Sequence, residues 1–520
     1  MKDEEVSEII EKYAKRIRMF EFEQAQKTVE QFRSTHCSGS GGVSVGVRNS
    51  TWLMLMQRLI ELAHAERSYI ALTFLTPPKS VVNPFPFSRK EPQVKMNYNA
   101  IRSGMQSAID LSTNATAEAD NEQSQLLVAH LLRQFHSFVN ARIDMMNFYE
   151  RLASLGVHSN RIVLTEEYVE KLADIKARHE GCFHHWILSS MKSAFFDELE
   201  LLLHLLTANM AINQLHMLKG VVALRHAQSR LRSWLGSVTV DERTKSTSSS
   251  WFSFGSTSKT HYPLALCHWL QGYYDFLVGK FTLFFHEFLM HQVVPSEEFG
   301  RHIDAIPKEA NFTLRFVSLA RKHDVAFAAL FADTRHRERT FSLTHAVQRF
   351  KVDDTNGQTS PAAAVAGTKP LERHADQTCN SLTKRNAGVT KRSPFIHCDT
   401  VMCLCRSIAW VDCTHAGGSS DGCEPLFHWP SEWRSCGERH RVLAAALMQC
   451  NSDGLTDKVT LVNSDTERPL LLTRVEPAII LLVGAAARQR DLEELKRSIE
   501  QFVVDLKCYR LFAALKSGMK

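Results

Sequence analysis

Apolar residues recur at steps of three and four from residue 5 to residue 237, and this spacing restricts the possible folds more than any other feature of the sequence. It places apolar side chains along one face of each helix, and that face must be covered by another element. Gly, Pro, Asn, Ser or Thr stands at nearly every break, as is typical of helix ends and turns. The sequence therefore predicts about seven consecutive helices joined by short links, which form a helical bundle.

Three of these helices have clear limits. One is predicted over residues 51–74 and must stop before Pro77-Pro78, because proline cannot continue a helix. A second is predicted over residues 125–155. A third begins behind Thr165, a good N-cap residue, and Glu166 and Glu167 in its first turn complement the helix dipole.

The bundle is expected to occupy residues 1–292. A Ser/Thr-rich stretch over 241–261 is predicted to be a loop, since it lacks any hydrophobic period. A further helix is predicted to run from Pro263 to about His291.

A smaller α/β domain is predicted over residues 293–520, which makes the whole chain α+β. Helices are expected over 311–323 and 491–507, and short β-like runs lie at 325–331, 458–462, 469–473 and 478–483. The run 478–483 is almost entirely apolar, as is typical of a central strand covered on both faces.

An irregular Cys-rich insertion, about 340–426, interrupts this domain. The wider stretch 335–425 is rich in Thr, Ala, Gly, His and Cys and shows no sustained period. Too little apolar area is available there to offset the entropy of ordering, so we expect a mobile segment.

Charge and composition exclude some classes of protein. Lys and Arg exceed Asp and Glu by only six, which argues against a dedicated nucleic-acid binder. The first ten residues are acidic, whereas a secretory signal would have a basic start and an apolar run. The least charged predicted helix, 201–218, holds too many polar groups to cross a membrane. We therefore expect a cytoplasmic chain with reduced thiols.

Two catalytic motifs fail on their context. Residues 42–46 match G-x-S-x-G, but a helical run and a Ser-Gly spacer precede Ser44, so no strand delivers it as a nucleophile. His286 and His291 are five residues apart, which turns their rings about 140° from each other on a helix, so they cannot share a zinc ion. The prediction is a protein that is not an enzyme and has no cofactor.

A cluster of cysteines and histidines over 398–440 offers an alternative, a zinc-binding and perhaps ligase-like protein. Its members are Cys398, Cys403, Cys405, Cys413, His415, Cys423, His428, Cys436 and His440. Zinc knuckles usually separate their paired ligands by two to four residues. The close pairs here, Cys403 with Cys405 and Cys413 with His415, are separated by one residue only. The spacing therefore favours scattered thiols, and no metal ligand is assigned.

Two opposite charges lie on the apolar stripes of two predicted helices. Glu66 falls on the stripe of the helix 51–74, and Arg142 falls on that of the helix 125–155. An unpaired buried carboxylate is costly, so we predict a structural ion pair between Glu66 and Arg142 inside the bundle. The alternative is that each long side chain reaches solvent at the edge of its stripe.

Several short strings resemble the KICSTOR subunit two family. In the N-terminal part they are Phe87-Ser88-Arg89-Lys90, Ala141-Arg142 with Phe148-Tyr149-Glu150, Phe183-His184-His185 with Ile187-Leu188-Ser189, and Leu203-His204-Leu205-Leu206. Further along they are Lys280-Phe281 with Phe285-His286-Glu287, His428-Trp429-Pro430, Leu472-Thr473-Arg474 with Glu476-Pro477, and Leu515-Lys516-Ser517-Gly518. They occur in the family's order, whereas the segment 340–426 does not resemble the family.

This resemblance implies a non-catalytic scaffold subunit of the KICSTOR complex. Its expected partners are the other KICSTOR subunits and the GATOR inhibitory complex, which it holds at the lysosomal membrane. The implied outcome is negative regulation of mTOR complex signalling when amino acids or glucose are short. By analogy, the C-terminal domain is expected to look like a roadblock or longin module.

Overall fold

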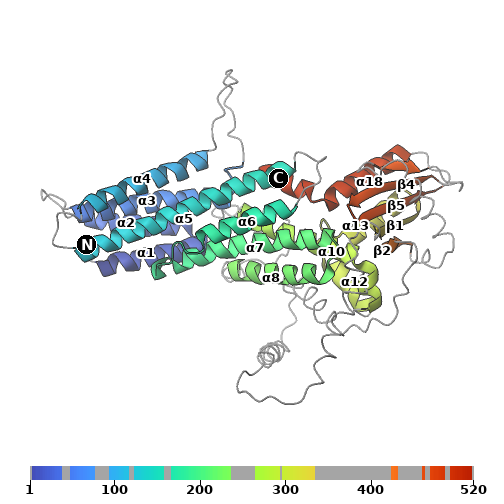
Figure 1. Ribbon diagram of the computed structural model, residues 1–520, viewed down its shortest axis with the longest axis horizontal. Helices are drawn as coiled ribbons and strands as arrows, with labels where there is room; N and C mark the ends of the chain where they lie inside the picture. The colour runs from blue at the N-terminus through green and yellow to red at the C-terminus, as the bar shows by residue number, and fades with distance from the viewer. Residues whose placement is uncertain are drawn as a thin grey trace, which may run out of the picture.

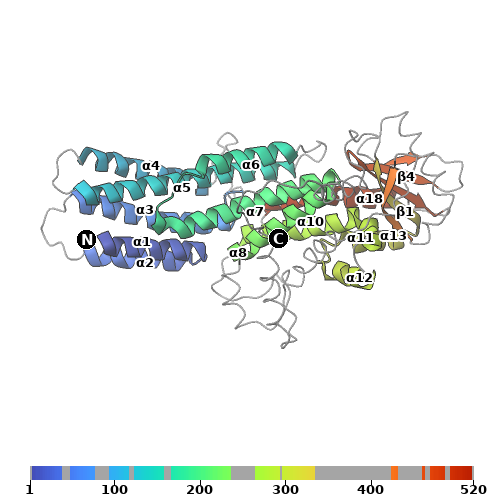
Figure 2. The same cartoon turned by 60° about the horizontal axis from the view of Figure 1, so that its bottom comes forward.

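The computed structural model describes residues 3–37, 47–75, 93–115, 122–156, 165–235, 264–292, 296–333, 423–430, 459–462, 469–486 and 492–517. The molecule is elongated, with long helices along its axis and a small sheet at one end (Figure 1). A rotation about that axis shows the same arrangement (Figure 2). The predicted order, a helical N-terminal region followed by a smaller region with a sheet, is therefore confirmed.

Eight α-helices cover the described residues between 3 and 235, where about seven were expected. They are α1 (Asp3–Arg18), α2 (Phe22–Cys37), α3 (Val47–Ile70), α4 (Gln93–Ala115), α5 (Glu122–Leu155), α6 (Thr165–His179), α7 (Ser189–Asn213) and α8 (Met217–Leu235). A short 3-10 helix, η1 (Trp186–Leu188), precedes α7. Their apolar faces meet in one core with fully buried aromatic rings such as Trp52, Tyr98 and Phe135, so tertiary packing stabilises these helices.

Helix α3 ends four residues before the predicted limit of 74. A turn follows Ile70, and Leu72 within it has a φ of 56°, in the left-handed region. The backbone at Leu72 therefore ends this helix, and the prolines at 77 and 78 are not needed to stop it. The predicted end at Leu155 agrees with α5, and the start predicted behind Thr165 lies within one residue of the start of α6.

Two helices, α10 (Ala265–Phe284) and α11 (His286–Gln292), replace the single helix predicted from Pro263 to about His291. Phe285 separates them, with φ of −111° and ψ of 18°, away from helical values. The prediction of one helix is wrong because buried apolar residues continue at four-residue steps across the break, at Phe281, Phe285 and Leu289. The hydrophobic period therefore carries no sign of the break.

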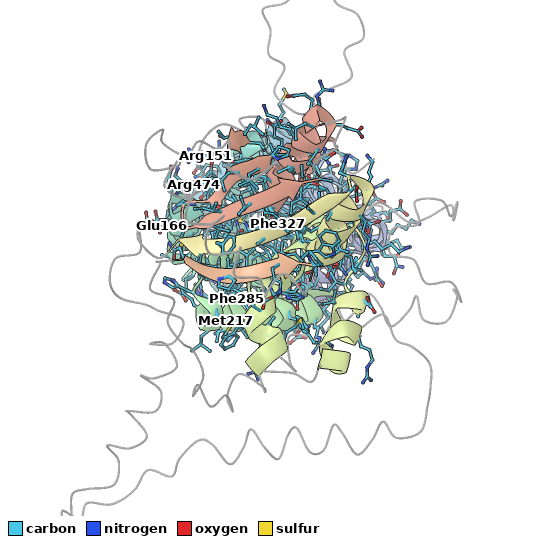
Figure 3. The ribbon with its side chains drawn as sticks, turned by 90° about the vertical axis from the view of Figure 1, so that its right-hand side faces the viewer. Arg151, Glu166, Met217, Phe285, Phe327 and Arg474 are labelled. Carbon is cyan, nitrogen blue, oxygen red and sulfur yellow. The ribbon has the colours of Figure 1, made fainter. Side chains whose placement is uncertain are left out.

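The C-terminal region holds a five-stranded antiparallel sheet in the order β2-β1-β5-β4-β3. Its strands are β1 (Val325–Asp333), β2 (Cys423–Trp429), β3 (Thr460–Val462), β4 (Leu470–Glu476) and β5 (Ile479–Ala485). Every residue of β5 is buried, which confirms the central strand predicted over 478–483. Figure 3 looks onto this sheet, with Phe327 of β1 labelled, and the Phe327 ring fills the space beside Gly484, where a Cβ would lie 2.3 Å from it.

Four helices flank the strands in the sequence. They are α12 (Ser296–Ala305), α13 (Phe312–Lys322), α18 (Leu492–Leu506) and α19 (Tyr509–Ser517). Two of them, α13 and α18, pack on the sheet. The side chain of Asn311 caps α13 by accepting a hydrogen bond from the Leu314 N–H at 3.1 Å. The Phe316 ring of α13 lies 5.4 Å from that of Phe427 on β2 and 5.2 Å from that of Phe502 on α18, so both helices share one core with the sheet.

The last helix, α19, returns to the bundle (Figure 1). Trp269 Nε1 on α10 donates to the Leu511 carbonyl at 2.9 Å. Gly156, just after α5, is so close to α19 that a Cβ on it would lie 2.3 Å from the Ala513 nitrogen. The bundle and the C-terminal region are therefore in direct contact, and the division at residue 292 stays a prediction.

Strand β2 corrects one edge of the predicted irregular segment. Residues 423–426 belong to this strand, and the rest of the segment 340–426 lies outside the described residues. The prediction is wrong at 423–426 because Pro425 argues against a strand. β2 is an edge strand of the sheet, however, and there a missing N–H is tolerated.

Candidate functional site

Arg142 on α5 lies between two glutamates from neighbouring helices. Its Nε donates to Glu66 Oε1 and its Nη2 to Glu66 Oε2, both at 2.9 Å, which is the bidentate geometry of a strong ion pair. Its Nη1 donates to Glu198 Oε2 on α7 at 2.5 Å. All three residues are at most 3% exposed. The structure thus brings Glu66 and Arg142 together and adds Glu198.

Three tyrosine hydroxyls complete this buried network. Tyr98 donates to Glu66 Oε1 at 2.7 Å, while Tyr69 and Tyr149 donate to Glu198 Oε1 at 2.5 and 3.2 Å. Burial raises the pKa of each tyrosine, and the nearby carboxylates raise it further, so the hydroxyls remain protonated donors.

The Arg142 guanidinium keeps its charge in this setting. Burial alone would lower the pKa of Arg142, but the charges of Glu66 and Glu198 outweigh that effect and raise the pKa well above its usual value. The guanidinium carbon also lies 4.5 Å from the centroid of the Tyr69 ring, within range of a cation–π contact. The donors of Arg142 are thus engaged inside the core, where they tie α3, α5 and α7 together.

Glu198 is the member of the network that the sequence reasoning missed. Its neighbours Phe195, Leu202 and Leu205 follow the helical spacing, so the signal that identified Glu66 was also present here. A charged residue on an apolar stripe of α7 needs a buried partner just as Glu66 does.

A second buried cation joins the bundle to the sheet. Lys280 on α10 is fully buried, and its Nζ lies 3.0 Å from Glu476 Oε1 at the end of β4. The same nitrogen lies 3.5 Å from Asn209 Oδ1 on α7. Sequence reasoning missed this ion pair because 196 residues separate its two partners.

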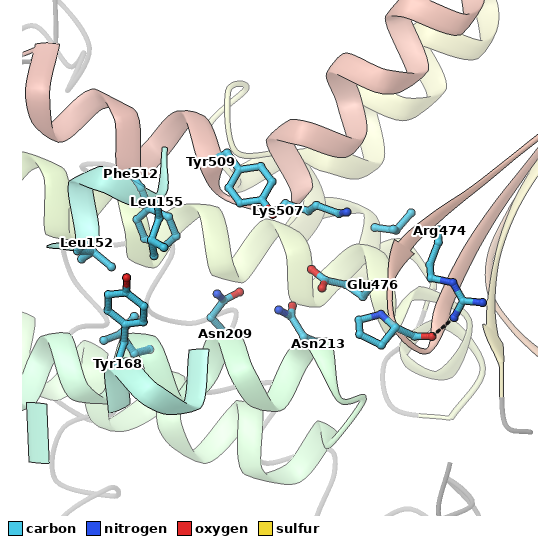
Figure 4. Close-up of a pocket in the computed structure, with 13 residues that line it drawn as sticks. Leu152, Leu155, Tyr168, Asn209, Asn213, Arg474, Glu476, Lys507, Tyr509 and Phe512 are labelled. Carbon is cyan, nitrogen blue, oxygen red and sulfur yellow. Dashed lines mark hydrogen bonds between the residues drawn. The ribbon is translucent and has the colours of Figure 1, made fainter. Parts of the chain in front are cut away.

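A pocket of about 210 Å³ opens beside this joint, between the bundle, the turn after β4 and the start of α19. Its lining residues are Leu152, Leu155, Tyr168, Leu206, Asn209, Asn213, Arg474, Val475, Glu476, Pro477, Lys507, Tyr509 and Phe512. Figure 4 shows the Glu476 carboxylate and the amides of Asn209 and Asn213 pointing into it. The pocket therefore combines an apolar wall with several polar groups.

A partly buried carboxylate, that of Glu287, links α11 to the edge strand β2. His428 Nδ1 lies 2.9 Å from Glu287 Oε1, and His286 Nδ1 lies 3.7 Å from the same oxygen. Burial would raise the pKa of Glu287, but hydrogen bonds with the two histidines outweigh it and lower the pKa. His428, one of the candidate zinc ligands, is thus engaged with a carboxylate.

The remaining candidate motifs fall mostly outside the described residues. Ser44, and the candidate zinc ligands apart from Cys423 and His428, lie there, and the side chain of His291 is not described. Within the described ranges, no group of three or more His, Cys, Asp or Glu residues is placed to hold a metal ion. His185 instead caps η1 by accepting a hydrogen bond from the Ile187 N–H at 3.4 Å.

Among the described helices, none is both long and apolar enough to cross a membrane.

The sequence model of the family described as "KICSTOR complex C12orf66 like" matches residues 3–385. The chain is 30% identical over 334 residues to "KICSTOR subunit 2" of Danio rerio, covering 64% of this chain and 69% of that protein. It is 28% identical over 319 residues to "KICSTOR subunit 2" of Xenopus laevis, covering 61% of this chain and 67% of that protein. The chain belongs to the family of KICSTOR complex proteins that this match describes.

Proposed function

We propose that this chain is a non-catalytic scaffold subunit of a KICSTOR complex. The observation that carries the proposal is the family match over residues 3–385, together with the two relatives named KICSTOR subunit 2. The buried network around Arg142 supports it, because the charged groups of that network bond to one another inside the core and hold helices together. On this proposal the other KICSTOR subunits are the direct partners.

The finer role that we propose is recruitment. The subunit helps to hold the GATOR inhibitory complex on lysosomes and so restrains mTOR complex signalling when amino acids or glucose are short. It works from the cytoplasm and is peripheral on the lysosomal membrane, which it reaches through its partners, and it does not contact nucleic acid. The resemblance of its sequence strings to the family supports this role.

We also propose that the C-terminal part forms a roadblock-like or longin-like module from about residue 293 onward. Support comes from the five-stranded antiparallel sheet, with α13 before its first strand and α18 after its last. Superposition of an experimental structure of this region on known modules of both kinds tests the proposal, and a different strand order would contradict it.

The test of the scaffold role is complementation in cells that lack their own KICSTOR subunit 2. We expect the tagged chain to co-purify with the other KICSTOR subunits and to restore the lysosomal fraction of the GATOR inhibitory complex during amino-acid starvation. Signalling through the mTOR complex should then fall on starvation, as in unmodified cells. Absence of the other KICSTOR subunits from the purified material would contradict membership of the complex. Their presence without any recruitment of GATOR would contradict only the finer role.

A further inference from the structure

Helix α8 has one continuous exposed face. Its exposed residues recur at steps of three and four, and most of the residues between them are buried, chiefly against α7. Such steps bring side chains onto one side of a helix. Figures 1 and 2 both show α8 at an outer edge of the described elements. The middle of this outer face is a line of five exposed residues, Leu218, Val222, Arg225, Ser229 and Arg232.

The outer face of α8 carries positive charge without compensation. The helix has Lys219, Arg225 and Arg232 on its exposed side, and its sequence contains no Asp or Glu. Among the described residues, no carboxylate pairs with any of these three cations. Unpaired cations that stand together produce a positive potential, which attracts anionic groups.

The carboxylates of α7 beside this helix are already paired. Asp197 Oδ1 lies 3.1 Å from an Arg230 nitrogen on α8, and its Oδ2 lies 3.9 Å from Arg18. The Glu200 carboxylate lies 2.5 Å from Arg230 and 3.0 Å from Lys176. Two carboxylates thus face three cations, so α7 does not neutralise the outer face of α8.

Two aliphatic side chains stand at one end of the same face. Leu218 and Val222 lie about one helical turn apart, and each is 44% exposed. Exposed aliphatic residues that stand singly are ordinary on protein surfaces. Two of them on one turn, followed by unpaired cations, are the combination found in helices that lie on a membrane surface.

We propose that the outer face of α8 binds an anionic membrane surface, with the helix lying parallel to the bilayer. Lys219, Arg225 and Arg232 contact the acidic lipid headgroups, and Leu218 and Val222 enter between them. The formal net charge of the chain, +6, also favours its approach to such a surface. This contact is additional to any that partner proteins make, and it does not depend on the proposed scaffold role.

The test is co-sedimentation of the purified full chain with lipid vesicles. The probe vesicles contain phosphatidylcholine with about 30% phosphatidylserine, and the comparison vesicles contain phosphatidylcholine alone. In about 0.1 M salt we expect binding to the acidic vesicles to be at least about tenfold tighter, and about 0.5 M salt should release the chain. Equal binding to both kinds of vesicle, or no binding up to about 5 mM acidic lipid, overturns the proposal.

Variants at exposed positions locate the contact. Arg225→Gln combined with Arg232→Gln should weaken binding to the acidic vesicles about 25-fold, because each cation near such a surface contributes about fivefold. Lys12→Gln combined with Lys15→Gln removes the same net charge from exposed positions of α1 and should bind like the unmodified chain. An equal loss in both double variants would mean that net charge and not this face binds lipid, which overturns the proposal.

The same variants separate a membrane from an acidic protein as the occupant of this face. Loss of the other KICSTOR subunits on co-purification of the Arg225→Gln and Arg232→Gln double variant, with unchanged vesicle binding, would assign the face to a protein. Thermal midpoints check that each variant is folded. If a variant fails to fold, the comparison of the two kinds of vesicle and of the two salt concentrations on the unmodified chain decides the question.

Discussion

At the scale of single residues, one guanidinium with two carboxylates organises the interior of the bundle. The contact between Glu66 and Arg142 could be predicted, because opposite charges on two buried stripes each need a partner. Glu198 lies on an apolar stripe in the same way, so its burial could be predicted, but the balance of one Glu and one Arg gave no reason to place a third charge at the same contact. Its place in the network depends on how α7 packs between its neighbours.

Removal of the central charge should destabilise the fold strongly. We expect Arg142→Met to lower the free energy of unfolding by about 3–5 kcal/mol, because it leaves two buried carboxylates without their cation. The double change with Glu66→Leu should recover only part of this loss, since Glu198 stays unpaired, whereas a triple change with Glu198→Leu should recover more. Urea unfolding followed by circular dichroism measures these values.

Lys322→Met is the matched control for this series. Lys322 pairs with Glu494 at 3.1 Å, and both side chains are more than half exposed. Its loss should leave the urea midpoint unchanged, because surface pairs contribute little. If Arg142→Met had as little effect as this control, the buried network would not stabilise the bundle.

Asp275 on α10 should make the stability depend on pH. Burial raises its pKa from 3.8 to about 7, although a hydrogen bond with Gln271 opposes the shift. The folded chain thus holds a proton that the unfolded chain releases between about pH 4 and pH 7, so the Asp275 contribution falls by about 1.4 kcal/mol per pH unit across that range. Asp275→Asn should be as stable as the unmodified chain near pH 3 and increasingly more stable as the pH rises to about 7, with the full difference kept at pH 8. Parallel curves of stability against pH would contradict this.

At the scale of elements, helix α10 packs closely against the chain just before α13, and Gly279 makes this contact possible. A Cβ on Gly279 would lie 1.8 Å from the Ala310 carbonyl oxygen, whereas a Cβ on Gly272 of the same helix would meet nothing within 4 Å. Gly279→Ala should therefore force the chain before α13 away and cost about 1–3 kcal/mol. Gly272→Ala should be neutral or stabilising by up to about 1 kcal/mol, since alanine favours helices. Equal thermal midpoints for the two variants would show that the contact between Gly279 and Ala310 leaves room for a methyl group.

Helices and central strands follow from hydrophobic period, and for that reason they could be predicted. The strand 478–483 is apolar on both faces and lies at the centre of the sheet as β5. The break at Phe285 could not be found, because it changes the backbone and leaves the apolar pattern intact. Strand β2 was missed because its edge position tolerates Pro425, and the edge becomes apparent only when the order of the strands is known.

At the scale of the whole molecule, the long segment between β1 and β2 begins and ends at one place. Asp333, the last residue of β1, pairs with Cys423, the first residue of β2. A connection between neighbouring antiparallel strands can be short, and its closure entropy grows only slowly with length. The sheet therefore places no demand on the length of the connection over residues 334–422.

Deletion of residues 355–420 should leave the fold nearly unchanged. We expect a thermal midpoint within about 2 °C of the full chain and equal recovery of the other KICSTOR subunits in co-purification. Loss of the fold on deletion would contradict this expectation. Unfolding of the full chain by a chelator, with about one zinc ion released per chain, would favour the zinc-binding alternative.

The return of α19 to the bundle also has a consequence during synthesis. The indole N–H of Trp269 on α10 donates to the Leu511 carbonyl, which is synthesised 242 residues later. On the ribosome, the bundle therefore emerges with the surface that receives α19 uncovered, including the backbone beside Gly156. A premature stop codon upstream of α19 would release a chain with that apolar surface exposed, which is what chaperones and proteases of the quality-control system recognise.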